Sequence, residues 1–439
     1  MNSPSPPPLQ KHYNFAADSF DPHAFGGADG NRTALVSDVG AGIVSRHTFL
    51  DLAEDSCRLA HILSIAGVKP GDVAILLMAP SGAAAVALLA AMRVGAVAAP
   101  MPLDVSIDFL SGKISRLKVG AVIGDQHSID LVSAIAHVFP DIRHFSAANA
   151  SAERVPELWT SLIGIPEHFE SRRSSSRDPA LLLHHEDMPA GALYSFGALR
   201  ARIAAAERTY RGFPIVGDVV WSVSDWASEN GWIDAVLPSW NCGVPVVATP
   251  SDPADLDGIL TRWGVRAVHL PTGNLPLFRQ AMGTKKTPLR VLAAVGEMSY
   301  ADHVFLKERF GRAFAPVFAS PVFGPMLVPD AGAGMEGAYG KPPPRYSVDV
   351  VDAKGRILPA GEIGEISVLA NEPFLPLGAN KCRGCTRIGR WLGLGKPGKR
   401  DLDGVFWPDP ALTPPPPSPP RKKPPGRRLA PPNPKDRWS

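Results

Sequence analysis

A regular alternation of helical and extended patterns constrains this chain most, and it runs from about residue 14 to residue 370. Thr48–Leu63 has apolar side chains at helical spacing, with Thr48 positioned to cap the helix. Val73–Leu77 and Val119–Ile123 are short apolar runs typical of strands buried on both faces. Because such strands alternate with helices, the sequence predicts an α/β fold of parallel sheets covered by helices on both sides.

The same alternation predicts the other elements of the fold. Ser81–Val94 is expected to form a helix that leads into the buried strand Gly95–Pro100, and Ser128–Val138 to form another helix. Tyr346–Val351 and Ile363–Leu369 differ from this pattern and predict a hairpin-like β segment. The alternation continues through a further set of short runs: Val219–Val223, Gly231–Leu237, Val246–Ala248, Asp255–Trp263, Ala267–Leu270 and Leu289–Ala294.

Length and charge narrow the class of protein. The 439 residues, 45% of them hydrophobic, predict a globular protein with a large core and two or three domains or subdomains. The tail 408–439 carries a charge of +5 and the whole chain +3, so the rest carries about −2. A near-neutral body argues against a nucleic-acid-binding domain. The longest apolar run, Ala83–Pro100, is interrupted by Arg93 and Gly95, so no membrane span is expected.

The cysteines bear on compartment and on metal chemistry. Four cysteines are too few for a disulfide scaffold and suit a reducing compartment, which predicts a cytoplasmic protein. Cys382 and Cys385 form an isolated CxxC motif, which supplies at most half of a zinc site. The sequence favours a chance occurrence of this motif. Zinc binding and redox chemistry are the alternatives. The N-terminus lacks an apolar core, so no signal peptide is expected.

Composition divides the chain into four segments. Residues 1–11 are Pro-rich and expected to be loose, and residues 12–370 are expected to form the large domain. Residues 371–407 are rich in glycine and basic side chains and are interpreted as a degraded end of that domain. The tail 408–439 has 13 prolines and almost no aliphatic side chains, so we expect disorder with polyproline II character.

Short sequence blocks recur in a fixed order over residues 14–370. The most specific are Gly340-Lys-Pro, Val348-Asp-Val-Val-Asp352 and Leu358-Pro-Ala-Gly-Glu-Ile-Gly-Glu-Ile366. In this order the blocks resemble the AMP-forming acyl-CoA synthetases of the adenylate-forming superfamily, closest to the acetyl-CoA and medium-chain acyl-CoA synthetase branch. Earlier blocks of the same resemblance are Tyr13–Ala17, Thr48–Leu52, Gly67–Leu76, Gly95–Pro100, Leu237–Val247 and Gly296-Glu297.

The resemblance implies a fold and a reaction. The fold is the large N-terminal portion of an adenylate-forming enzyme: two doubly wound α/β subdomains and a partial β-barrel subdomain, with the C-terminal domain expected to be absent. In the family's reaction a carboxylic acid and ATP give an acyl-adenylate and pyrophosphate, and CoA then displaces AMP. The implied cofactors are ATP or AMP, Mg²⁺ and CoA, and the implied partner is a small carboxylate. This chemistry needs a phosphate-binding loop, an acidic Mg²⁺ ligand and a cation.

The phosphate loop is the first departure from the family pattern. It corresponds to residues 178–193, which are about three residues short and place Ala190 where the family has a lysine. Glu186 and Asp187 would bring negative charge to the site of the triphosphate, where it is repulsive. The neighbouring pair His184-His185 is not a recognised metal-ligand spacing, so no metal site is predicted.

Two further positions depart from the pattern. The resemblance puts Val322 where the family has its Mg²⁺-binding glutamate, and an aliphatic side chain cannot ligate a metal. It puts Lys396 where the family has the ribose-binding aspartate. An ammonium group has no acceptor for the two ribose hydroxyls. Use of ATP, Mg²⁺ and CoA by this chain is therefore in doubt.

Part of the site is retained. Phe318 is placed to stack on adenine, and Val295, Gly296 and Glu297 match the backbone strip beside adenine. An apolar acyl pocket is expected around Asp225, Trp226 and Trp232, although these tryptophans are equally well explained as core aromatics.

The sequence therefore predicts an acyl-CoA synthetase-like protein that is inactive or severely impaired, with no catalytic residues assigned. The alternatives are a non-catalytic acyl- or nucleotide-binding or interaction protein, and a decayed gene product. The basic Pro-rich tail is either a docking arm for a partner or the product of another reading frame. We favour the second because the resemblance decays gradually from about residue 371.

Overall fold

The computed structural model describes residues 11–411 apart from 28, 39–42, 147–156, 186, 211–212, 214, 250–254, 283–288, 311–316, 321, 330–336, 345 and 410. The predicted loose N-terminus, apart from residue 11, and the Pro-rich tail beyond residue 411 lie outside the described residues. Two six-stranded sheets, a smaller antiparallel sheet and a short β-hairpin make up the β structure of the described part.

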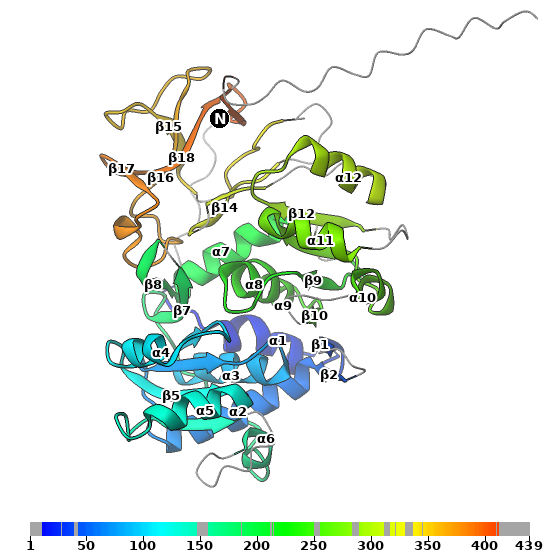
Figure 1. Cartoon of the computed structure of the whole chain (residues 1–439), viewed down its shortest axis with the longest axis vertical. Coiled ribbons are helices and arrows are strands. Elements are labelled where there is room, and N and C mark those ends of the chain that lie inside the picture. The colour runs from blue at the N-terminus through cyan, green and yellow to red at the C-terminus, as the bar shows by residue number, and fades with distance from the viewer. Residues whose placement is uncertain are drawn as a thin grey trace, which may run out of the picture.

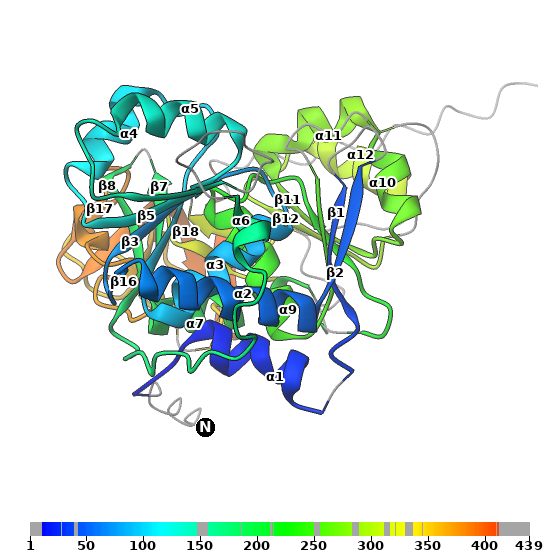
Figure 2. The same ribbon diagram turned by 90° about the horizontal axis from the view of Figure 1, so that it is seen from below.

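The first sheet has the strand order β6-β5-β3-β4-β7-β8, in which all neighbours are parallel except the antiparallel pair β7–β8. Helices α4 and α5 pack on one face of this sheet, and α2 and α3 on the other (Figure 2). The elements are α2 (Phe49–Ile65), β3 (Val73–Leu77), α3 (Gly82–Val94), β4 (Val97–Pro100), α4 (Ile107–Ile114), β5 (Val119–Gly124), α5 (Gln126–Ile135), β6 (Arg143–Ser146), β7 (Pro179–His185) and β8 (Met188–Ser195).

The second sheet has the order β12-β11-β9-β10-β1-β2 and is parallel except at its β1–β2 edge. Helices α10, α11 and α12 cover its outer face. The elements are β1 (Thr33–Asp38), β2 (Val44–Thr48), α7 (Phe196–Thr209), β9 (Val220–Ser222), α8 (Glu229–Gly231), η2 (Trp232–Val236), α9 (Leu237–Asn241), β10 (Val246–Ala248), α10 (Leu256–Arg262), β11 (Ala267–Pro271), η3 (Thr272–Asn274), α11 (Leu275–Ala281), β12 (Val291–Val295) and α12 (Tyr300–Phe310).

A shared inner layer joins the two sheets. Helices α2, α3, α7 and α9 lie between them and form, with the inner faces of both sheets, the largest apolar cluster (Figure 2). Helix α3 is buried along its whole length, and its run of small alanine side chains allows the neighbouring layers to approach closely. The predicted α/β class with two doubly wound sheets is therefore confirmed.

The small antiparallel sheet follows in the order β15-β16-β18-β17, with β19 paired to β18. It lies at the end of the molecule opposite the first sheet (Figure 1). Strands β17 to β19 come from the segment 371–408 and pair directly with the β15–β16 hairpin or with one another. The elements are β13 (Phe318–Ser320), β14 (Gly324–Leu327), β15 (Val348–Val351), β16 (Gly364–Leu369), η4 (Ala379–Lys381), β17 (Thr386–Ile388), β18 (Trp391–Arg400) and β19 (Phe406–Pro408).

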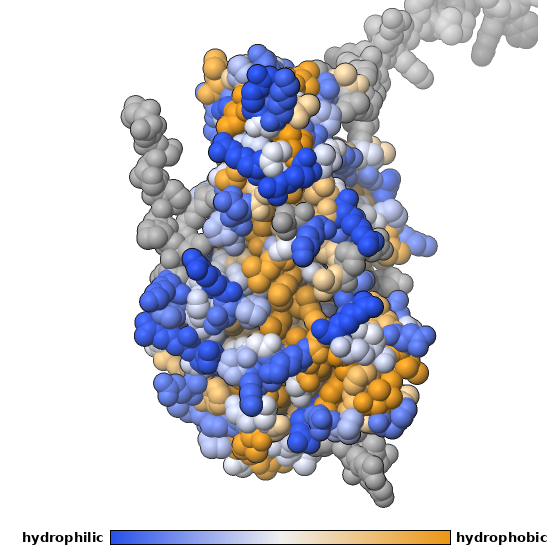
Figure 3. Space-filling view, turned by 90° about the vertical axis from the view of Figure 1, so that its left-hand side faces the viewer, coloured by the Kyte–Doolittle hydropathy of each residue, from blue (hydrophilic) through white to orange (hydrophobic). Residues whose placement is uncertain are grey.

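Figure 3 shows apolar surface gathered in a strip that runs down one side of the molecule between hydrophilic side chains. Within the described residues, no helix is both long enough and apolar enough to cross a membrane. The short helical segments not yet given are η1 (Ala16–Phe20), α1 (Asp21–Phe25) and α6 (Leu158–Ser161).

Candidate nucleotide site

The end of β12 forms the backbone strip that the sequence assigns to adenine. Gly296 has a φ of 116°, and its amide donates to the carbonyl of Val317 at 3.0 Å. A Cβ at this position would come 2.3 Å from the hydroxyl oxygen of Thr272, so both the conformation and the close approach require glycine. Val295 is bridged to Val317, which brings the strip next to the start of β13.

Phe318, the candidate for adenine stacking, lies at the first position of β13. Its side chain is buried, and its ring centroid is 4.6 Å from that of the half-buried Tyr339. Burial, together with the nearby carboxylate of Glu297, raises the pKa of Tyr339. The structure thus brings Val295, Gly296 and Glu297, at the end of β12, next to Phe318, at the start of β13.

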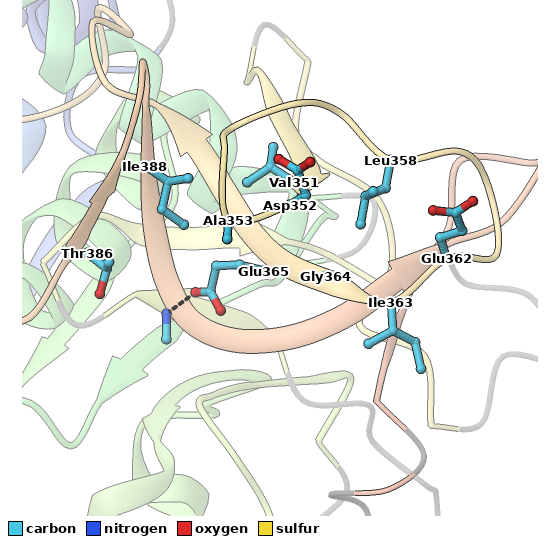
Figure 4. Close-up of a pocket in the computed structure, with 11 residues that line it drawn as sticks. Val351, Asp352, Ala353, Leu358, Glu362, Ile363, Gly364, Glu365, Thr386 and Ile388 are labelled. Atoms are coloured by element: carbon cyan, nitrogen blue, oxygen red, sulfur yellow. Dashed lines mark hydrogen bonds between the residues drawn. The ribbon is translucent and has the colours of Figure 1, made fainter.

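An ion pair joins the segment after β12 to β18 of the small sheet. The ammonium group of Lys396, on β18, donates to Oε1 of Glu297. The backbone amides of Gly395 and Lys396 donate to Oε1 of Glu365 at 2.5 and 3.2 Å, which fixes this part of β18 (Figure 4). Lys396 stands where the family resemblance expects the ribose-binding carboxylate. A paired cation therefore occupies that position.

A hollow of about 540 Å³ adjoins Gly395 on the small sheet (Figure 4). Among the described residues, its lining includes the acidic residues Asp352, Glu362 and Glu365 and no lysine or arginine. Like charges repel at short range, so this hollow is unsuited to a phosphate group. It contains none of the residues that the sequence assigned to the nucleotide or acyl pockets.

The β7–β8 hairpin stands where the resemblance places the phosphate loop. The two strands pair as far as His185 opposite Met188, and Ala190 is exposed on β8. The amide of Asp187 donates to Nδ1 of His185 at 3.1 Å, and the ring of His184 packs edge-on against Phe109. Glu186 lies outside the described residues. No three histidine, cysteine or acidic side chains of the described chain gather as metal ligands would.

Val322, at the expected Mg²⁺-ligand position, is part of the apolar core. Its side chain is buried, and its carbonyl oxygen accepts a hydrogen bond from the hydroxyl of Tyr194 at 2.8 Å. A carboxylate at this position would have to be buried among apolar side chains. The surroundings of Val322 therefore do not fit a Mg²⁺ ion.

Both tryptophans of the expected acyl pocket lie in the apolar core, and Asp225 beside them is half-buried. The rings of Trp226 and Trp232 are 4.4 Å apart, and Trp240 lies 6.1 Å beyond Trp232. Asp225 accepts a hydrogen bond from the amide of Ala227 at 3.0 Å, and burial raises its pKa. The three rings pack on one another within the largest apolar cluster.

A buried polar cluster beside these rings was not expected from the sequence. The guanidinium of Arg202 donates to Asp234 at 3.0 Å and to the Tyr194 hydroxyl at 3.1 Å. Burial raises the pKa of Glu229 to about 7 and lowers that of His269 to about 4. The sequence carried one signal for the burial of Arg202. Helical spacing puts it on the same face as the apolar residues of α7, Leu199, Ile203 and Ala206.

The fold and the recurring blocks define a protein of the adenylate-forming class, and comparison with known families agrees. The family model described as "AMP-binding enzyme" matches residues 24–371. The chain therefore belongs to this family of adenylate-forming, acyl-CoA synthetase-like proteins.

Individual relatives are distant in sequence. The chain is 26% identical to acetyl-coenzyme A synthetase of Salmonella typhi over 319 residues, covering 65% of this chain and 48% of that protein. It is 23% identical to a mitochondrial acyl-coenzyme A synthetase of Rattus norvegicus, covering 91% of this chain and 72% of that protein. The chain thus spans about half the length of the acetyl-coenzyme A synthetases it matches.

Solved structures share the fold. An acyl-CoA synthetase of Brucella canis superposes with a TM-score of 0.77 at 18% identity, covering 92% of this chain and 76% of that one. ATP-bound MatB of Rhodopseudomonas palustris superposes with a TM-score of 0.74 at 20% identity, covering 90% of this chain and 78% of that one.

Proposed function

We propose that this chain keeps the scaffold of an acyl-CoA synthetase but does not activate carboxylic acids with ATP, or does so only very slowly. The observation that carries the proposal is the Lys396–Glu297 ion pair. It puts a cation at the position of the ribose-binding carboxylate and engages a residue of the adenine strip. The ribose hydroxyl groups donate hydrogen bonds at this position, and the ammonium group of a lysine has no acceptor for them.

Two other features support the same proposal. Val322 offers no ligand for Mg²⁺ and lies among apolar side chains. Asp187 brings a carboxylate to the hairpin that corresponds to the phosphate loop, where the family chemistry needs hydrogen-bond donors and positive charge. The residues present therefore do not fit Mg²⁺-ATP as the family binds it.

The proposed ancestral reaction follows from the family. It joins a small carboxylic acid to CoA at the expense of ATP, which yields AMP and pyrophosphate. The ATP-bound state of MatB, whose fold is shared, supports a nucleotide as the ancestral ligand, and the family resemblance assigns the strip at Val295–Glu297 to it. Under our proposal, this chain retains at most a weakened site for the adenine part of AMP.

Pyrophosphate exchange tests the proposal directly. We expect the chain, given ATP, Mg²⁺ and a series of short- and medium-chain acids, to incorporate labelled pyrophosphate into ATP no faster than a protein-free control. An active acyl-CoA synthetase assayed in parallel shows that the conditions support exchange. Acid-dependent exchange clearly above the protein-free rate would contradict the proposal.

Restoring the ribose carboxylate gives a positive test. We expect Lys396→Asp to tighten binding of AMP by about tenfold, because a carboxylate hydrogen bond to a hydroxyl contributes roughly 1.5–3 kcal/mol. The control Lys396→Gln also breaks the ion pair but supplies no charged acceptor, so its affinity should stay near that of the parent chain. Titration calorimetry measures both. Equal affinities for the two variants would refute the role assigned to position 396.

A further inference from the structure

The CxxC motif lies on a tight turn that directly follows η4. The amide of Cys382 donates to the carbonyl of Ala379 at 3.1 Å, which closes the turn before the motif. The sulfur atoms of Cys382 and Cys385 are 2.7 Å apart, and the Cys385 thiol donates to the Cys382 sulfur. Both cysteines are free thiols. The backbone has therefore already brought the two sulfurs into contact.

This turn is seated on the β7–β8 hairpin. The amide of Arg383 donates to the carbonyl of Asp187 at 2.9 Å, and the amide of Leu377 donates to that of Leu193 at 2.6 Å. Gly384 lies so close that a Cβ there would come 2.6 Å from Oδ2 of Asp187. The glycine inside the motif thus permits the contact, and the hairpin holds the two cysteines in place.

The exposure of the two thiols differs. Cys382 is buried and Cys385 is half-buried, so a small reagent reaches the pair from the side of Cys385. Burial, the contact with Cys382 and the Asp187 carboxylate all raise the pKa of the Cys385 thiol. The raised pKa leaves a smaller fraction of Cys385 as thiolate at neutral pH than in a free cysteine, so its reaction as a nucleophile should speed up as the pH rises.

We propose that Cys382 and Cys385 are a redox-active dithiol that undergoes exchange with low-molecular-weight disulfides such as oxidised glutathione. One cysteine thiolate attacks the glutathione disulfide and releases one glutathione as its thiolate. The other cysteine then displaces the second glutathione from the mixed disulfide. The protein loses two S–H bonds and gains one S–S bond, and the two glutathione thiols carry away both protons.

The other two cysteines provide the internal comparison. Cys57 is buried in α2 and Cys242 follows α9, and no sulfur contact joins either one to a second cysteine of the described chain. A disulfide confined to positions 382 and 385 is therefore the specific outcome. It would tie the ends of the turn together and hold the Arg383–Asp187 contact more firmly.

The test uses the full chain, reduced and then equilibrated with oxidised glutathione. We expect the free thiols to fall from four to two, and mass spectrometry to find an internal disulfide between Cys382 and Cys385. We also expect the Arg383 amide to exchange its hydrogen several-fold more slowly in the oxidised protein. Four remaining thiols at equilibrium, or glutathione attached to separate cysteines without an internal bond, would overturn the proposal.

Two variants sharpen the experiment. Cys57→Ala combined with Cys242→Ala should retain the internal disulfide and fall to no free thiols. Cys385→Ser should form no internal disulfide and leave the Arg383 amide unchanged by glutathione, and circular dichroism verifies that this variant folds. Slowed exchange of the Arg383 amide in Cys385→Ser as well would show that glutathione acts elsewhere. The outcome is independent of the proposed loss of ATP-dependent activity, because no step uses a nucleotide.

Discussion

At the scale of single residues, a few buried charged side chains have a large effect on how the chain packs. Arg93 interrupts the longest apolar run of the sequence, yet its side chain is completely buried. It donates to both carboxylate oxygens of Asp21, at 2.6 and 2.8 Å, and to the hydroxyl of Ser56 at 2.9 Å. The sequence showed a charged residue within a buried helix. Only the structure shows the carboxylate, 72 residues earlier, that makes its burial tolerable.

Glu229 gives a pH-dependent prediction at this scale. Burial raises its pKa from 4.5 to about 7, and its Oε1 has no hydrogen-bond partner among the described residues. The charged groups that face it are Arg202 and Asp234. The unfolded chain ionises first, so the free energy of unfolding should fall as the pH rises from 4.5 to about 7 and then level off.

Glu229→Gln should remove this dependence. At about pH 8 we expect the variant to be more stable than the parent chain by up to about 3 kcal/mol, and near pH 4 to differ little from it. Denaturant unfolding at both pH values measures the difference. Glu167→Gln, whose parent side chain is 60% exposed, is the control and should change stability by less than about 1 kcal/mol. A variant of Glu229 whose stability still falls over this range would contradict the assignment.

At the scale of elements, local signals placed most helices and strands. The predicted strands Val73–Leu77 and Val246–Ala248 are confirmed at those bounds, and α2 begins after Thr48 as the capping pattern predicts. The β1–β2 edge was missed. Its strand β1 (Thr33–Asp38) pairs with β10, and that partner lies more than two hundred residues later. A pairing at such separation leaves no periodic signal within either segment.

The start of α2 supplies a prediction for an element. The Thr48 hydroxyl accepts from the Asp51 amide at 3.0 Å, and the Asp51 carboxylate accepts from the Thr48 amide at 2.8 Å. We expect Thr48→Ala to lower the free energy of unfolding by about 1 kcal/mol. Chemical denaturation measures the loss. Ser64→Ala, exposed near the other end of the helix, should stay within about 0.5 kcal/mol of the parent chain. Equal effects of the two changes would rule out a capping role.

At the scale of the whole molecule, Arg202 joins parts that are far apart in the chain. It lies on α7 and donates to Tyr194 of β8 and to Asp234 of η2. A Cβ on Gly324 of β14 would come 2.0 Å from the same guanidinium, so the hairpin packs directly on it. One fully buried side chain therefore connects the first sheet, the inner helical layer and the β13–β14 hairpin.

Removing this connection should destabilise the molecule as a unit. Arg202→Met leaves Asp234 buried without its partner, and we expect a loss of about 3–5 kcal/mol. Adding Asp234→Leu to it should recover a large part of that loss, because the unpaired charge is then gone. Arg208→Met, exposed on the same helix, should have an effect of at most about 0.5 kcal/mol. Unfolding followed by tryptophan fluorescence measures all three, and no recovery in the double variant would contradict the buried-charge explanation.

The sequence by itself determined the α/β class, most of the strands and helices, and the family resemblance. These features depend on local periodicity and on short blocks of residues, which can be read without knowing which segments meet. The tertiary structure alone decided that Lys396 pairs with Glu297, that Arg202 pairs with Asp234, and that the CxxC turn rests on Asp187. Each is a contact between segments that the chain keeps apart until the layers pack, and packing is what brings those charged and backbone groups within hydrogen-bonding distance.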